Sequence, residues 1–89
     1  MKVRELQALL AKYDPDTTVL IAGFETTASL DVAEADLVIS CHSVSKPESA
    51  MSGNRNISVE GEPSIWIGWN NDYRTESFLD ALVNPENYA

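Results

Sequence analysis

The amino-acid sequence predicts a small α+β domain, in which helices flank a mixed or antiparallel sheet of about four strands. Two observations predict this class. Apolar residues recur at helical spacing near both ends of the chain, and they alternate with polar residues in short segments between those ends. With 89 residues, of which 44% are hydrophobic, the chain can build one core but not two, so we expect residues 1–89 to form a single domain.

Residues 2–13 are predicted to form an N-terminal amphipathic helix. Val3, Leu6 and Leu10 recur at helical spacing and give the helix one apolar face. Pro15 disfavours a helical conformation at the residue before it, so we expect the helix to end there.

Two strands are predicted in the middle of the chain. Residues 17–22 are rich in β-branched side chains and apolar on successive positions, which is typical of a strand covered on both faces. Residues 24–30 are predicted to be a loop. Residues 35–42 favour a second strand, and a short helical turn at 31–34 remains open as an alternative.

Residues 43–55 predict a long, mobile loop, because they contain four serines, Pro47 and Gly53 without any periodicity. Residues 56–60 and 64–69 alternate apolar and polar side chains on either side of a short turn, and they predict a β-hairpin.

A short C-terminal helix is predicted over residues 76–83. Thr75 is a suitable N-terminal cap, Phe78 and Leu82 supply part of an apolar face, and Pro85 ends the helix.

The charge of the chain is strongly negative and unevenly distributed. The net charge is −8, made up of +2 for residues 1–12, −6 for 13–45 and −4 for 46–89. Residues 13–45 contain no lysine or arginine. A net negative charge repels phosphate backbones, so direct binding to nucleic acid is disfavoured.

Composition and the N-terminus indicate a cytoplasmic protein. A single cysteine, Cys41, excludes an intrachain disulfide, and small secreted domains usually depend on several. The first residues lack the apolar segment of a secretory signal, and no apolar run approaches the length of a membrane span.

The candidate chemical groups favour structural roles. Cys41 and His42 are neighbours on a predicted strand, so their side chains should point to opposite faces and cannot form a nucleophile pair. Asp14 and Asp16 flank Pro15, and either bind a cation or simply end the helix; the second is favoured because a calcium loop needs more oxygen ligands. No nucleotide-binding, hydrolase or paired-cysteine motif is present, so we expect no catalytic residues, no metal and no cofactor.

Six acids of the middle segment and one tryptophan are the candidate partner-binding residues. Asp31, Glu34 and Asp36 are consistent with a solvated acidic face or with a partly convergent carboxylate site. Trp66 and Trp69 should lie on opposite faces of a regular strand, one in the core and the other as an exposed anchor for a partner. The candidate residues are Asp14, Asp16, Glu25, Asp31, Glu34, Asp36 and Trp69.

The run from Val3 to Glu25, with its Asp14-Pro15-Asp16 stop and the following Val-Leu-Ile-Ala-Gly strand, resembles a class of short phage, prophage and bacterial proteins without assigned chemistry. These proteins open with a helix, a DPD stop and a VLIAGYE-like strand. The resemblance covers about a quarter of the chain and implies a phage-associated accessory protein.

Together these observations lead to three hypotheses. The first is a non-enzymatic acidic interaction protein that engages a basic surface of a host protein in the host cytoplasm. It is similar in charge to small phage proteins that inhibit nucleic-acid-binding defence machinery such as CRISPR complexes. The second is a structural or oligomerisation domain whose acidity only gives solubility, and a homo-oligomer is compatible with it. The third is a carboxylate-based binder of a small ligand or divalent cation.

Overall fold

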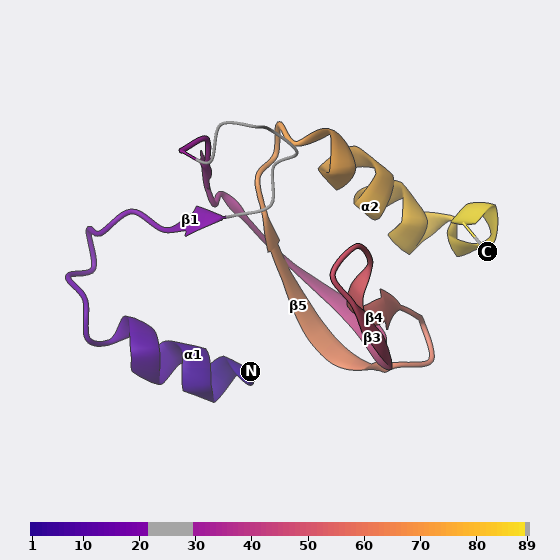
Figure 1. Cartoon of the computed structure of the whole chain (residues 1–89), viewed down its shortest axis with the longest axis horizontal. Helices are drawn as coiled ribbons and strands as arrows, with labels where there is room; N and C mark the ends of the chain where they lie inside the picture. The colour runs from indigo at the N-terminus through magenta and orange to yellow at the C-terminus, as the bar shows by residue number, and fades with distance from the viewer. Residues whose placement is uncertain (22–29, 89) are drawn as a thin grey trace.

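The computed structural model describes residues 1–21 and 30–88, and these residues form the predicted α+β arrangement. Two antiparallel sheets lie between an N-terminal and a C-terminal helix (Figure 1). In chain order the elements are α1 (Val3–Leu10), β1 (Leu20–Ile21), β2 (Ala33–Glu34), β3 (Leu37–Ser49), β4 (Gly53–Ile57), β5 (Glu62–Gly68), α2 (Tyr73–Val83) and the 3-10 helix η1 (Pro85–Tyr88).

Helix α1 lies within the predicted range 2–13 and ends before the Asp-Pro-Asp sequence. Asp14 Oδ1 accepts a hydrogen bond from the backbone N–H of Asp16 at 2.8 Å, and the Asp14 carbonyl accepts one from Thr17 at 3.0 Å. These bonds form a local turn of the kind that aspartate favours. The helix therefore ends three residues earlier than predicted, and the Asp-Pro-Asp sequence forms a separate turn after it.

The first sheet is much smaller than predicted. Strands β1 and β2 are antiparallel, with Leu20 opposite Glu34 and Ile21 opposite Ala33. The prediction of a strand over 17–22, covered on both faces, is wrong for residues 17–19, which are exposed and lie outside any strand. Their β-branched side chains favour extended backbone, and the Val19 carbonyl accepts a hydrogen bond from the Ala35 N–H at 2.8 Å, but β2 is too short to pair with residues 17 and 18.

The alternative of a helical turn at residues 31–34 is also wrong, because Ala33 and Glu34 form β2. Residue 30 is exposed, and residues 24–29 of the predicted loop lie outside the described residues.

Strand β3 is the centre of the second sheet, whose order is β4-β3-β5. Its first half pairs with β5, from Leu37 opposite Gly68 to Ser43 opposite Glu62. Its second half pairs with β4, from Ser43 opposite Ile57 onward. The predicted hairpin between residues 56–60 and 64–69 is therefore wrong. The strands that contain these segments, β4 and β5, instead pair with opposite edges of β3, which continues well past residue 42.

The predicted loop at residues 43–55 is also wrong, because most of it is the hairpin of β3 and β4. The pairing shifts register between Ser45 and Ser49, and Pro47 lies in this interval. A proline has no N–H to donate to a ladder and is tolerated where the pairing is irregular. Gly53 then has a φ of +79°, a conformation that glycine adopts without the steric cost of a side chain.

Helix α2 begins earlier than predicted. Its N-terminal cap is Asp72, whose side chain accepts a hydrogen bond from the backbone N–H of Arg74 at 2.9 Å. Thr75, the predicted cap, lies inside the first turn and is almost fully buried. Its hydroxyl donates to the carbonyl of Trp69 at 2.6 Å, which fixes the helix to the end of β5.

One aromatic contact holds α2 against the sheet. The rings of Trp66 and Phe78 are stacked, with centroids 4.2 Å apart and planes 15° from parallel. Because side chains alternate along strands, the inner face that carries Trp66 also carries Leu37, Ile39 and Cys41. We call the opposite side the outer face; its apolar residues are Val38, Val44, Ile65 and Ile67.

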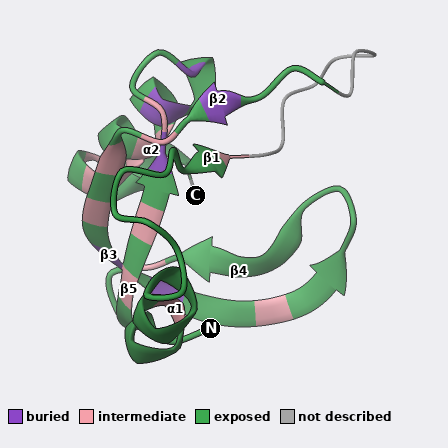
Figure 2. Ribbon diagram, turned by 90° about the vertical axis from the view of Figure 1, so that its left-hand side faces the viewer, coloured by how far each residue is buried: buried purple, intermediate pink, exposed green. Residues whose placement is uncertain are grey.

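Few side chains are buried anywhere in the described residues. Figure 2 shows most of the ribbon as exposed. Ala33 and Cys41 are the buried hydrophobic residues, beside the buried polar residues Ser43, Asp72 and Thr75. Among the described residues, neither helix has the length and apolar character needed to cross a membrane.

Candidate protein-interaction surface

The predicted partner-binding acids that the structure describes are all exposed. The structure divides them into two groups. Asp14 and Asp16 lie on the turn between α1 and β1, whereas Asp31, Glu34 and Asp36 lie on and around β2. Glu25, the sixth predicted acid, lies outside the described residues. The structure therefore arranges the described acids as two surface groups.

Two of these carboxylates take part in local structure. Asp14 accepts the hydrogen bond from Asp16 described above. Asp36 Oδ1 accepts a hydrogen bond from the backbone N–H of Asn70 at 2.7 Å, and the Asp36 N–H donates to the Gly68 carbonyl at 3.0 Å. These bonds connect the start of β3 to the end of β5. Asp36 therefore has a structural function that sequence alone did not reveal.

The remaining three acids have free carboxylates. In the described part of the chain, the side chains of Asp16, Asp31 and Glu34 take part in no hydrogen bond or ion pair. The ion pairs found among the described residues are Arg55 with Glu62 and Arg74 with Asp72. None of these four residues belongs to the segment 13–45, which contains no lysine or arginine. The negative charge of Asp16, Asp31 and Glu34 is thus not neutralised by a described basic side chain.

Trp69, predicted to be an exposed anchor, is half-buried just beyond the end of β5. Its carbonyl accepts hydrogen bonds from Thr75 and from the backbone N–H of Asp72. Trp66 is the tryptophan that packs against α2, which agrees with the expectation of a packing role for at least one of the two.

Cys41 and His42 point to opposite faces of β3, as predicted. Cys41 is buried on the inner face, whereas His42 is exposed. Burial raises the pKa of the Cys41 thiol, which reduces the fraction of reactive thiolate at neutral pH.

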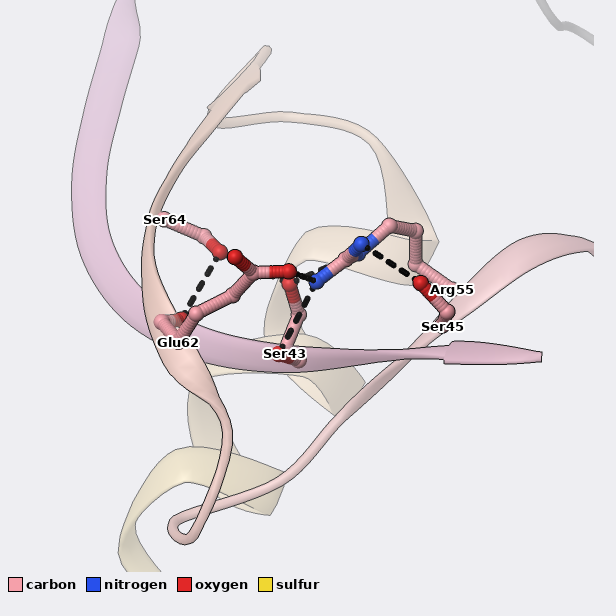
Figure 3. Close-up of polar contacts among 5 residues, drawn as sticks. All are labelled: Ser43, Ser45, Arg55, Glu62 and Ser64. Atoms are coloured by element: carbon pink, nitrogen blue, oxygen red, sulfur yellow. Dashed lines mark hydrogen bonds and ion pairs between the residues drawn. The ribbon is translucent and has the colours of Figure 1, made fainter. Parts of the chain in front are cut away.

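The best-connected polar group of the second sheet is a cluster around Arg55 (Figure 3). The Arg55 guanidinium donates to Ser43 Oγ at 3.1 Å, to Ser45 Oγ at 3.0 Å and to the Ser43 carbonyl at 3.0 Å. It also forms an ion pair with Glu62. Ser43 Oγ in turn lies 2.7 Å from Ser64 Oγ. The cluster joins all three strands β4, β3 and β5.

The charge of Arg55 has an electrostatic effect within this cluster. The hydrogen bond from Arg55, followed by its positive charge, lowers the pKa of the Glu62 carboxyl. Sequence reasoning missed the cluster because it assigned Ser43, Ser45 and Arg55 to a loop. Residues 41–46 do not alternate apolar and polar side chains, so hydrophobic periodicity offered no signal for this part of β3.

An open hollow of about 340 Å³ lies between the end of α1 and the segment that leads to β1. Its lining combines apolar side chains with threonines and one carboxylate: Leu10, Tyr13, Asp14, Pro15, Thr17, Thr18 and Val19. In the parts of the chain that the structure describes, no three His, Cys, Asp or Glu side chains gather closely enough to hold a metal ion.

Comparisons of this chain with protein-family models, with curated proteins and with solved structures give no match.

Proposed function

We propose that this chain is a non-enzymatic interaction protein whose acidic surface binds a basic surface of another protein. The observation that supports this function is the exposure of Asp16, Asp31 and Glu34, with no basic partner among the described residues, in a chain of net charge −8.

Unpaired exposed carboxylates favour a basic partner for an electrostatic reason. Complementary surface charge attracts a partner during diffusion and raises the association rate, and this attraction weakens as salt is added. A protein surface that ordinarily contacts phosphate groups has the required positive charge. Given the resemblance of residues 3–25 to phage and prophage proteins, the partner would be a nucleic-acid-binding host protein, such as a component of a defence complex.

Charge reversal at free carboxylates tests the proposal without disturbing the fold. The bait is the full chain carrying Asp31→Lys and Glu34→Lys, and Asp36 is left unchanged because it bonds to Asn70. The matched control carries Glu48→Lys and Glu60→Lys, which make the same change in net charge at exposed positions elsewhere.

Immobilised baits are incubated with a bacterial lysate, and the captured proteins are eluted with increasing salt. We expect the wild type and the control to capture basic nucleic-acid-binding proteins that duplex DNA displaces, and the Asp31/Glu34 variant to lose most of them. Capture that is equal for the two variants and insensitive to salt would mean that the acidity contributes solubility alone.

A further inference from the structure

Among the described residues, the apolar face of α1 is largely uncovered. Val3 and Leu10 are 50% and 47% exposed, although their spacing places them on one face of the helix, and Tyr13, beyond the end of the helix, is 65% exposed. Leu6, between them, is only half-buried. The helix makes no more than sparse contacts with any other element. An isolated helix this short is marginal in water, so its apolar face requires packing to be stable.

The outer face of the second sheet is also uncovered. Val38 is 69% exposed and Ile65 is 43% exposed, and Ile67 lies directly opposite Val38 on β5. Helix α2 packs on the other side of this sheet, through Trp66 and Phe78. In Figures 1 and 2, α1 and α2 lie on opposite sides of β3 and β5.

The chain exposes more surface than a compact monomer of its size. The chain exposes 7302 Å², whereas a compact monomer of this mass exposes roughly 5,200 Å². Its radius of gyration is 14.5 Å, against about 12 Å for a compact domain of this length. The excess is roughly 2,000 Å² per chain, so two chains together carry the area that an obligate homodimer buries.

The distribution of charge along the chain favours contact between α1 and the rest of a second copy. Residues 1–12 carry a net charge of +2, and residues 13–89 carry −10. A basic helix against an acidic body is electrostatically favourable, whereas contact between the bodies alone would bring like charges together.

We propose that a second copy of this chain covers both faces, in a two-fold dimer in which α1 of each copy packs on the outer face of the other. One two-fold operation supplies each helix with a sheet and each sheet with a helix. Such a contact goes beyond the proposed function, since it uses apolar faces and leaves Asp31 and Glu34 at the surface.

The first test is the molar mass of the full chain in solution, measured by sedimentation equilibrium over the micromolar range. We expect a dimer at physiological salt and also at roughly 1 M salt, because high salt screens charges but does not weaken apolar contacts.

Leu10→Glu on α1 and Val38→Glu on the outer face should each shift the mass to that of a monomer. The matched control is Val83→Glu, at a 77% exposed position near the end of α2, which should remain dimeric. A wild type that is monomeric throughout, or a dimer that both variants leave intact, would overturn the proposal.

The second test requires no disruptive substitution. A chain carrying Val3→Cys is mixed with a tagged chain carrying Val38→Cys, and a short bifunctional maleimide is added. We expect a cross-linked pair of chains, and no such product when Val83→Cys replaces Val38→Cys. A Val3→Cys/Val38→Cys chain that cross-links only within itself would show that α1 packs on its own sheet, and would refute the proposal.

The dimer and the acidic binding surface can fail independently. The variant with Asp31→Lys and Glu34→Lys should have the molar mass of the wild type. If that variant loses salt-sensitive capture while remaining dimeric, both proposals stand. A monomeric wild type that still captures basic proteins would refute the dimer alone.

Discussion

Gly68 has no side chain, and the ring of Trp66 occupies the space where a Cβ atom would lie. That ring cannot simply move away, because it is stacked on Phe78 at 4.2 Å. An alanine at position 68 should therefore displace Trp66 and loosen the attachment of α2. We expect Gly68→Ala to lower the free energy of unfolding by about 1–3 kcal/mol, measured by urea denaturation.

A double-mutant cycle distinguishes this clash from a general cost of alanine in β5. In a Trp66→Ala background the space beside residue 68 is empty, so adding Gly68→Ala should cost little further stability. An equal loss in both backgrounds would place the effect in the backbone of β5 and not in the ring.

Asp72 should make the stability of the chain depend on pH. Hydrogen bonds from the Arg74 side chain, and then from its backbone N–H, lower the pKa of the Asp72 carboxyl. A carboxyl with a lowered pKa in the folded state stabilises the fold above its ordinary pKa of about 4, and this contribution is lost as the pH falls through the folded-state value.

Asp72→Asn keeps a capping side chain but removes the titrating group. The difference in unfolding free energy between wild type and variant should be largest near neutral pH and should shrink as the pH falls below about 4. Urea denaturation at several pH values measures this difference. A difference that is constant with pH would mean that the charge of Asp72 is not stabilising.

At the residue scale, sequence reasoning was correct where the answer depends on local geometry. The alternation of a strand is enough to separate Cys41 from His42, and Pro15 is enough to exclude a helix that continues past Asp14. The hydrogen bond between Asp36 and Asn70 could not be predicted from the sequence, because these residues come together only when β3 pairs with β5.

At the scale of elements, the hairpin of β3 and β4 contains residues that usually indicate a loop. Residues 43–55 combine serines with Pro47 and Gly53, a composition typical of loops, and they lack the apolar alternation on which the prediction of a strand depended. Ser49 instead orders the tip of the hairpin, where its Oγ accepts hydrogen bonds from the N–H groups of Met51 and Ser52. Arg55 stabilises the other end through polar contacts that hydrophobic patterning does not reveal.

Replacement of Arg55 should therefore loosen the contact between β4 and β3. We expect Arg55→Ala to cost on the order of 1 kcal/mol and to speed hydrogen exchange of the β4 amides. Arg55→Lys should restore little, because a single ammonium cannot reproduce the planar set of donors that reaches both serines and Glu62. Full protection of the β4 amides in Arg55→Ala would show that the backbone ladder holds the hairpin without this cluster.

At the scale of the whole molecule, the spacing of apolar residues predicted the α+β class and the composition gave the negative charge, but neither predicted the degree of exposure. The apolar stripe of α1 was visible in the sequence, whereas its position away from its own sheet was not. Amphipathic periodicity predicts that one face of a helix will be buried, but it does not indicate which surface will cover that face.

A dimer that buries these faces should have a stability that depends on protein concentration. Because folding and association are then coupled, the thermal midpoint should rise by about 4 °C for each tenfold increase in concentration. Differential scanning calorimetry at several concentrations measures this shift. Val38→Glu should remove the dependence, and a wild-type midpoint that is independent of concentration would contradict coupled folding and association.

The buried thiol of Cys41 also makes this chain a reporter of its own motion. Thiol reagents react with an exposed thiolate. Both the burial of Cys41 and the raised pKa of its thiol oppose that reaction while the inner face is covered. Since the chain contains a single cysteine, every labelling event records one opening of the inner face. At a reagent concentration high enough that labelling is faster than reclosing, the labelling rate of the unmodified protein thus gives the frequency at which the inner face opens at Cys41, without any introduced probe.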